Sequence, residues 1–238
     1  MLKALGMAVL FVGGLANSNL AAKDRAEQGS QKKHPHNLPD IDVTEEETLA
    51  IDQEINVNSA SAVSNSSIDY GLPKGWNIGV SFLNAQFYVS RSDAWSFQPD
   101  ALMNLEKHWN LGPGRLVIGT QTGAGFLAQG TVVMSYSYLD FQQHFSDWDV
   151  DFDVGSYYAN ARVAGWQSVG LHVNIEIPLG GVLRLNGDYL SGGNGVAATT
   201  LKLLYPLSKD LQLAAGIQVA GAQNTGDDYA GLLGLYWH

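Results

Sequence analysis

The chain contains no cysteine. This absence excludes disulfide bonds, thiolate metal sites, cysteine nucleophiles and the lipid-modified cysteine of a lipoprotein. Charged residues make up only 15% of the 238 residues, below the roughly 25% that is usual in globular domains. The formal net charge of -10 argues against a nucleic-acid partner, because phosphate contacts need clustered Lys and Arg.

Long apolar runs are also missing. After Ala22 no segment reaches the ~18 apolar residues that a membrane-spanning helix needs. A membrane location would therefore require a closed β-barrel, since lipid offers no hydrogen bonds to an open sheet edge. The apolar segment Ala4–Leu15 is too short to span and predicts a signal peptide over residues 1–22, cleaved after Ser18 or after Ala22.

The sequence divides the mature chain into two parts. Residues 23–46 are polar, with few aromatic or branched apolar side chains, so we expect a disordered arm on the periplasmic side. From about Leu49 onwards charge becomes sparse, while Gly, Ser, Asn and aromatic residues increase. We assign residues 47–238 to a single domain.

Alternation of apolar and polar residues dominates that domain. It is clearest in the segments 98–110, 167–179, 183–189, 211–219 and 229–237. Turn-forming residues separate such runs, as in Asn110–Gly114 and Pro178–Gly181. Short links that alternate with longer ones favour an all-β fold, a closed antiparallel up-and-down transmembrane barrel of about 12 strands, with 10 as the alternative.

A soluble secreted β-sandwich would show the same alternation, but two features favour the membrane. The polar positions are mostly Asn, Gln, Ser, Thr and Gly, where soluble surfaces carry more Lys and Glu. Aromatic residues near the expected strand ends predict girdles at the two interfaces: Trp76, Trp109, Tyr136, Tyr138, Trp148, Tyr189, Tyr205 and Trp237.

Three short segments resemble a known family. Ile68–Gly79 (IDYGLPKGWNIG), Phe97–Asp100 (FQPD) and Asn104–Lys107 (NLEK) are similar to the outer-membrane transporter barrels of the MetA-pathway of phenol degradation family. The resemblance extends from about residue 50 to the C-terminus. It implies a barrel of about twelve strands and uptake of small organic molecules. The chain departs from such barrels by ending on His238, where an aromatic such as Phe is usual.

Alternating aspartates form the most specific pattern. Asp147, Asp149, Asp151 and Asp153 would all face one side of a strand, about 7 Å apart. One interpretation is a cation-favouring pore wall or a site for a hard cation such as calcium. The other is a solvated strand end, or a set of lumen partners for three basic residues: Arg162, Arg184 and Lys202.

Further candidates for the pore wall lie on the polar faces of other expected strands: Asp100, Glu106, His108, His172, Glu176 and Asp188. Ser168 and His172 share a face, but residues four apart on a strand are about 13 Å apart and form no catalytic dyad. The glycines of Gly123–Ala128 precede a strand-like run, so they do not form a dinucleotide loop. We expect no catalytic, cofactor or metal residues.

The sequence therefore predicts a non-enzymatic barrel in the outer membrane of a Gram-negative bacterium, acting as a pore or transporter for small solutes. Outer-membrane lipid and the barrel-assembly machinery are the expected partners. Two alternatives stay open: a structural or interaction barrel whose lumen is filled by side chains, and an outer-membrane enzyme that modifies lipids.

A fractionation experiment separates the barrel from the soluble sandwich. The protein should sediment with outer membranes, and unheated samples should migrate differently from boiled ones on a denaturing gel, because closed barrels resist the detergent. Recovery in the soluble fraction, with no mobility shift, would contradict the membrane prediction.

Overall fold

The computed structural model describes residues 44–238 except 60, 90–98, 128–129, 165–166, 195 and 222–228. The predicted signal peptide (1–22) and most of the predicted arm (23–46) lie outside the described residues. Of that arm, residues 44–46 are described, and Glu46 contacts the barrel, since its Oε1 accepts from Gly75 N–H at 3.2 Å.

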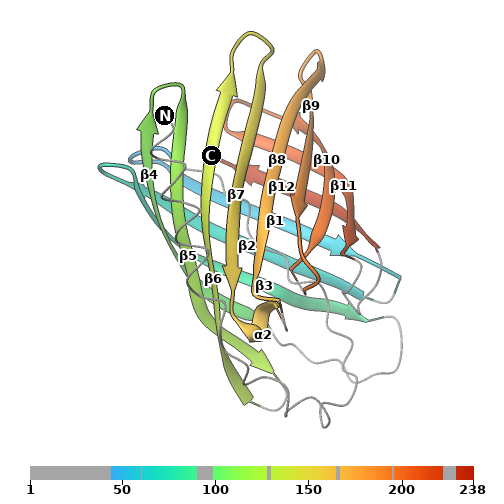
Figure 1. Cartoon of the computed structure of the whole chain (residues 1–238). Coiled ribbons are helices and arrows are strands. Elements are labelled where there is room, and N and C mark those ends of the chain that lie inside the picture. Colours follow the sequence, from blue (N-terminus) through green and yellow to red (C-terminus); the bar gives the residue numbers. More distant parts are fainter. Residues whose placement is uncertain are drawn as a thin grey trace. The chain divides into compact units, whose positions relative to one another are not determined.

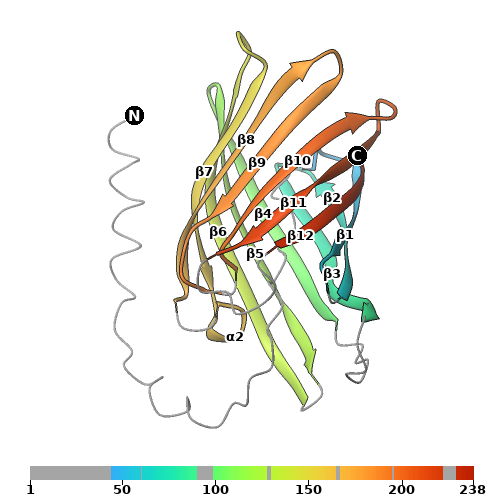
Figure 2. The ribbon, with the colours of Figure 1, turned by 90° about the vertical axis from the view of Figure 1, so that its right-hand side faces the viewer.

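Twelve antiparallel strands form one closed barrel, which confirms the predicted fold and strand number. The strands are β1 (Leu49–Val57), β2 (Ser61–Leu72), β3 (Trp76–Val89), β4 (Asp100–Leu111), β5 (Gly114–Leu127), β6 (Gly130–Phe145), β7 (Val150–Ala159), β8 (Val169–Gly180), β9 (Leu183–Leu190), β10 (Ala198–Pro206), β11 (Leu211–Ala220) and β12 (Tyr229–Trp237). Each strand pairs with its neighbours in sequence, and β1 pairs with β12 (Figures 1 and 2). No helix among the described residues is long and apolar enough to cross a bilayer.

The barrel has two unlike ends. At one, the turn end, the strands are joined by the short links 73–75, 112–113, 146–149, 181–182 and 207–210, and β1 begins beside the end of β12. At the other, the loop end, longer links include 160–168, which holds the single-turn helix α2 (Ala161–Ala164). Figures 1 and 2 place α2 at the opposite end from the β8–β9 turn.

Burial alternates along the strands, as the period of two predicts. In β12 the side chains of Leu232 and Tyr236 are buried, whereas Leu233, Leu235 and Trp237 are exposed. In β4 the carboxyl groups of Asp100 and Glu106 are buried while Met103 and Leu105 are exposed. Apolar side chains thus cover the outside of the barrel, and polar ones face the lumen.

Exposed aromatic side chains gather near both ends. Those near the turn end are Tyr70, Trp76, Trp109, Tyr205 and Trp237, and those near the loop end are Phe87, Tyr88, Phe126, Tyr158, Tyr189 and Tyr229. Lys107 is a charged residue at an outward position of β4, and the girdle explains why it is placed there. Its Nζ lies 5.7 Å and 5.1 Å from the ring centroids of Trp76 and Trp109. Its alkyl chain covers apolar surface while its ammonium stays at the polar edge.

Tyr136 and Tyr138 do not join the girdle, so this part of the prediction is wrong. Both side chains face the lumen, with exposed fractions of 2% and 8%. The reason is the register of β6, where Ser135 and Ser137 take the outward positions. The Tyr138 hydroxyl donates to Glu106 Oε2 at 2.6 Å, which gives this large side chain a polar partner inside the barrel.

Glycines on the inward faces create room for such partners. Gly119 of β5 lies directly opposite Tyr138, and a Cβ there would overlap the tyrosine ring. Gly155 of β7 lies opposite Asp140 of β6, and a Cβ there would overlap the Asp140 carboxyl group. In both places the glycine has no side chain, so residues on the two flanking strands can contact each other across the middle strand.

Replacing Gly119 by Ala should lower the free energy of unfolding by about 1–3 kcal/mol, because the new methyl group forces the Tyr138 ring aside. Reversible urea unfolding of the refolded barrel in micelles measures this. The control is Gly187→Ala in β9, where a Cβ would lie 3.6 Å from Ile175 and should change stability by less than about 0.5 kcal/mol. Equal effects of the two changes would contradict the role given to Gly119.

Candidate functional site

The lumen is strongly acidic. On the inward faces of the described strands lie ten carboxyl groups: Asp52, Glu54, Asp69, Asp100, Glu106, Asp140, Asp151, Asp153, Glu176 and Asp188. The lysines and arginines on the same faces are three: Arg115, Arg184 and Lys202. His108, His144 and His172 also face inward. Most of the predicted pore-wall residues thus share one interior.

At the centre of the barrel wall, His172 of β8 lies between two carboxyl groups. Its Nδ1 is 3.1 Å from Asp140 Oδ1 and its Nε2 is 2.8 Å from Asp188 Oδ2. The imidazolium form satisfies both contacts, since only that form donates from both nitrogens. Gly155 separates Asp140 from His172 on the intervening strand and leaves the contact open. His172 therefore joins β6, β8 and β9 through side chains.

Glu106 occupies a similar position across β5. Its Oε2 accepts from the Tyr138 hydroxyl at 2.6 Å, and its Oε1 accepts from Asn77 Nδ2 at 3.0 Å. The exposed fraction of Glu106 is 7%. This group therefore holds the barrel wall together and takes no part in the open cavity.

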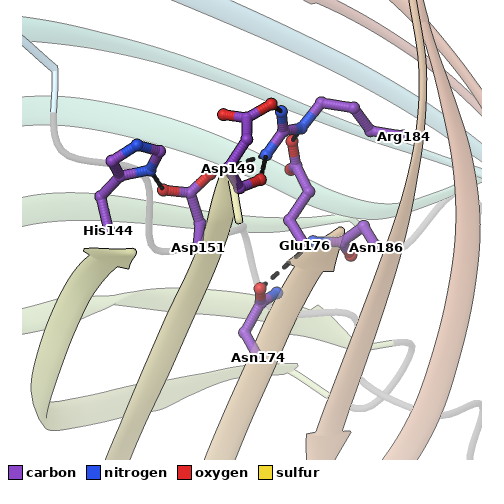
Figure 3. Close-up of polar contacts among 7 residues, drawn as sticks. All are labelled: His144, Asp149, Asp151, Asn174, Glu176, Arg184 and Asn186. Carbon is purple, nitrogen blue, oxygen red and sulfur yellow. Dashed lines mark hydrogen bonds and ion pairs between the residues drawn. The ribbon is translucent and has the colours of Figure 1, made fainter. Parts of the chain in front are cut away.

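Near the turn end, Arg184 of β9 gathers three acidic side chains (Figure 3). Its guanidinium contacts Asp149 Oδ2 at 2.6 Å and Asp151 Oδ2 at 3.0 Å, and it also binds Glu176 Oε1. The Asp151 carboxyl group accepts a second contact, with His144 Nδ1 at 2.8 Å. The positive charge of Arg184 is thus shared among three carboxylates.

The aspartates 147 to 153 do not form the predicted ladder, because the β6–β7 turn ends only at residue 149. Asp147 is exposed in that turn, and Asp149 adopts a left-handed backbone conformation with φ 53°. Only Asp151 and Asp153 lie on β7 and face the lumen. Asp149 and Asp151 contact Arg184, one of the three basic residues that the second interpretation named as partners.

Lys202 lies on β10, the strand next to β9, and contacts groups on β1 and β12. Its Nζ lies 4.0 Å from Glu54 Oε2 and 3.4 Å from the Tyr236 hydroxyl, and the same hydroxyl donates to Glu54 at 3.2 Å.

Two acidic residues of the lumen, Glu54 and Asp140, were not identified from the sequence. Glu54 could have been found, because it alternates with the apolar residues Leu49, Ile51 and Ile55. Asp140 was also missed, because the serines of β6 obscure which face is inward.

Other predicted residues have separate surroundings. Asp100 is buried near the loop end, where its Oδ2 accepts from Asn84 Nδ2 at 2.8 Å. His108 lies beside Gly75 at the turn end. The side chain of Arg162 lies outside the described part of the chain.

A cavity of about 400 Å³ occupies the lumen at the turn end. Its wall includes the inward side chains of β7, β8 and β9, among them Asp151, Asp153, Asn174, Glu176 and Asn186. Arg115, His172, Lys202 and Tyr236 also line it. The cavity therefore combines acidic, basic and amide groups in one polar compartment.

Towards the loop end the lumen is filled by packed side chains. There a buried cluster includes Tyr136, Tyr138 and Tyr157 together with Val163 of α2 and Val196 of the β9–β10 link. The ring centroids of Tyr136 and Tyr157 are 5.6 Å apart, and the Tyr157 hydroxyl donates to Ser191 O at 2.5 Å. Two of the loop-end links are thereby held inside the barrel mouth.

Solved barrels share this architecture. The chain aligns over 79% of its length with 98% of the KdgM porin, solved in complex with disordered oligogalacturonate, at 12% identity and a TM-score of 0.56. It aligns over 80% of its length with 100% of the NanC porin, at 11% identity and a TM-score of 0.56. Outer membrane phospholipase A from Escherichia coli aligns over 81% of this chain and 90% of its own, at 11% identity and a TM-score of 0.49.

Sequence comparisons add no closer relationship. No protein-family model matches the chain. No curated protein matches it significantly. The similarity to the two porins therefore concerns the fold, and the resemblance of Ile68–Gly79 to the MetA-pathway family stays a prediction.

Replacing His172 by Gln should lower the free energy of unfolding by about 3–5 kcal/mol, because Asp140 and Asp188 would lose the positive charge between them. Urea titration of the refolded barrel measures this. His144→Gln is the control, since its contact with Asp151 is half exposed and should contribute about 0.2–1 kcal/mol. A small effect of His172→Gln would contradict a structural role for the buried network.

Proposed function

We propose that this protein is an outer-membrane barrel that passes small solutes through its lumen. The cavity of about 400 Å³ inside a polar lumen is the observation that carries the proposal. A closed barrel that is apolar outside and polar inside lets solutes cross a bilayer without contacting lipid. Its own edges are all paired, so the wall can lie in lipid.

The outward surface supports the membrane location. Large apolar side chains such as Met103, Val133 and Leu171 are more than half exposed, at 63%, 68% and 59%. Exposed aromatic residues near both barrel ends match the interfacial girdles of outer-membrane barrels. By this analogy the short turns face the periplasm of a Gram-negative cell, and the partners are outer-membrane lipid and the barrel-assembly machinery.

Solutes of small size fit the proposal best. The KdgM porin, whose structure holds oligogalacturonate, shows that this fold accommodates a soluble ligand in that protein. For this chain the resemblance of Ile68–Gly79 to the MetA-pathway family favours small organic molecules. An enzyme that modifies lipids would need a base beside a nucleophile. Both ring nitrogens of His172 instead contact carboxyl groups, so that ring has no nitrogen left for a nucleophile.

The buried cluster at the loop end favours a second candidate function. Tyr136, Tyr157 and Val163 narrow the lumen there, and their exposed fractions do not exceed 4%. A barrel that stayed closed at this cluster would be a structural or interaction protein without flux. Passage requires the cluster, or the links that it anchors, to move.

Single-channel recording in planar bilayers tests the two candidates. The refolded protein should give discrete currents, and Tyr157→Ala should increase them several-fold by opening the loop-end cluster. Tyr158→Ala is the matched control, because that ring is 45% exposed on the outer surface and should leave the current unchanged. If only the Tyr157→Ala variant gave currents, the result would favour the barrel with a filled lumen. If neither the unmodified protein nor either variant gave currents, the pore proposal would be wrong.

A further inference from the structure

The cavity at the turn end lies in a part of the lumen where acidic groups outnumber basic ones. Asp151, Asp153 and Glu176 line it, and Arg115 and Lys202 are the permanently charged basic side chains among its described lining residues. The ammonium of Lys202 lies 4.0 Å from Glu54. Arg184, which also faces the lumen, contacts three carboxylates, and the His172 ring lies between two more. The field in the cavity therefore favours a positive solute.

Two buried amides provide an independent indication of a ligand. Asn174 and Asn186 line the cavity with exposed fractions of 7% and 6%. Asn186 Nδ2 donates to Asn174 Oδ1 at 3.2 Å (Figure 3), whereas no protein group in the described part of the chain donates to Asn186 Oδ1. A buried acceptor without a partner is costly, and a ligand N–H group would satisfy it.

We propose that this cavity binds a small organic cation with N–H donors, of the class of primary alkyl amines. The amine would donate to the Asn186 carbonyl oxygen while its charge is stabilised by Asp153 and Glu176. This assignment names the solute class of the pore proposed above and rests on that proposal. It also requires access from the turn end, because the tyrosine cluster narrows the lumen towards the loop end.

A metal ion fits this wall less well than an amine. No group of three His, Asp or Glu side chains in the described ranges has the geometry to hold one. Glu176 and Asp151 both bind Arg184, so that its guanidinium occupies the place between their oxygens that a metal ion would need. An ammonium group needs only separate acceptors around it, and charged hydrogen bonds of this kind are the stronger ones.

Calorimetry on the refolded full-length barrel in micelles tests the assignment. Putrescine is the cationic probe, and succinate is the anionic probe with the same number of carbon atoms. Putrescine should bind, and succinate should not. Preferential binding of succinate, or no binding of putrescine at millimolar concentration, would overturn the proposal.

Two variants locate the site. Asp153→Asn keeps the side-chain shape and should weaken putrescine binding on the order of tenfold, the effect of one charged hydrogen bond. Asn186→Leu removes the free acceptor and should weaken it similarly. The control is Asp147→Asn, which removes the same charge from an exposed position in the β6–β7 turn and should leave the affinity unchanged. If Asp153→Asn and Asp147→Asn weakened putrescine binding equally, the proposed site would be wrong.

Planar bilayers with a KCl gradient separate this inference from the proposed function. Currents with a reversal potential that favours potassium, and that putrescine blocks, support both. Chloride-selective currents that putrescine does not affect would overturn the cation site but would still support the pore. Putrescine binding in micelles without any current in bilayers would support the site and defeat the pore.

Discussion

The pairing of β1 with β12 is the constraint on which the whole structure depends. Seven residue pairs, from Ile51 with Trp237 to Val57 with Gly231, close the sheet on itself. Because no strand edge remains, every strand has neighbours on both sides and the apolar outer face can lie in lipid. Closure also creates an interior, and the chemistry of the protein is confined to it.

Glycine then decides which interior groups meet. Compact side chains on strands separated by one other strand can meet where the middle strand carries a glycine, whereas the long Arg184 side chain reaches Asp151 across β8 without one. Gly155 permits the contact of Asp140 with His172, and Gly119 permits that of Glu106 with Tyr138. Such contacts link strands that are not adjacent in the sheet. Buried charged groups such as Asp140 and Glu106 therefore stabilise the barrel wall.

The two halves of the lumen differ in chemistry. The turn end holds a polar cavity with acidic and amide groups, and the loop end holds tyrosines packed against two links. An acidic cavity beside a constriction of packed tyrosines is suited to holding a small cation that reaches it from the turn end. The same constriction makes flux depend on movement of the tyrosine cluster.

Sequence alternation by itself determined the all-β class, a strand number of about 12 and the outward face of the most regular strands, because a period of two is a local property of extended chains. It identified Glu106, His172 and Arg184 as inward groups. It could not show that Asp147 and Asp149 lie in a turn, that Tyr136 and Tyr138 point inward, or that His172 meets Asp140. Those features depend on the register between strands and on a glycine in the strand between them, which only the closed tertiary structure decides.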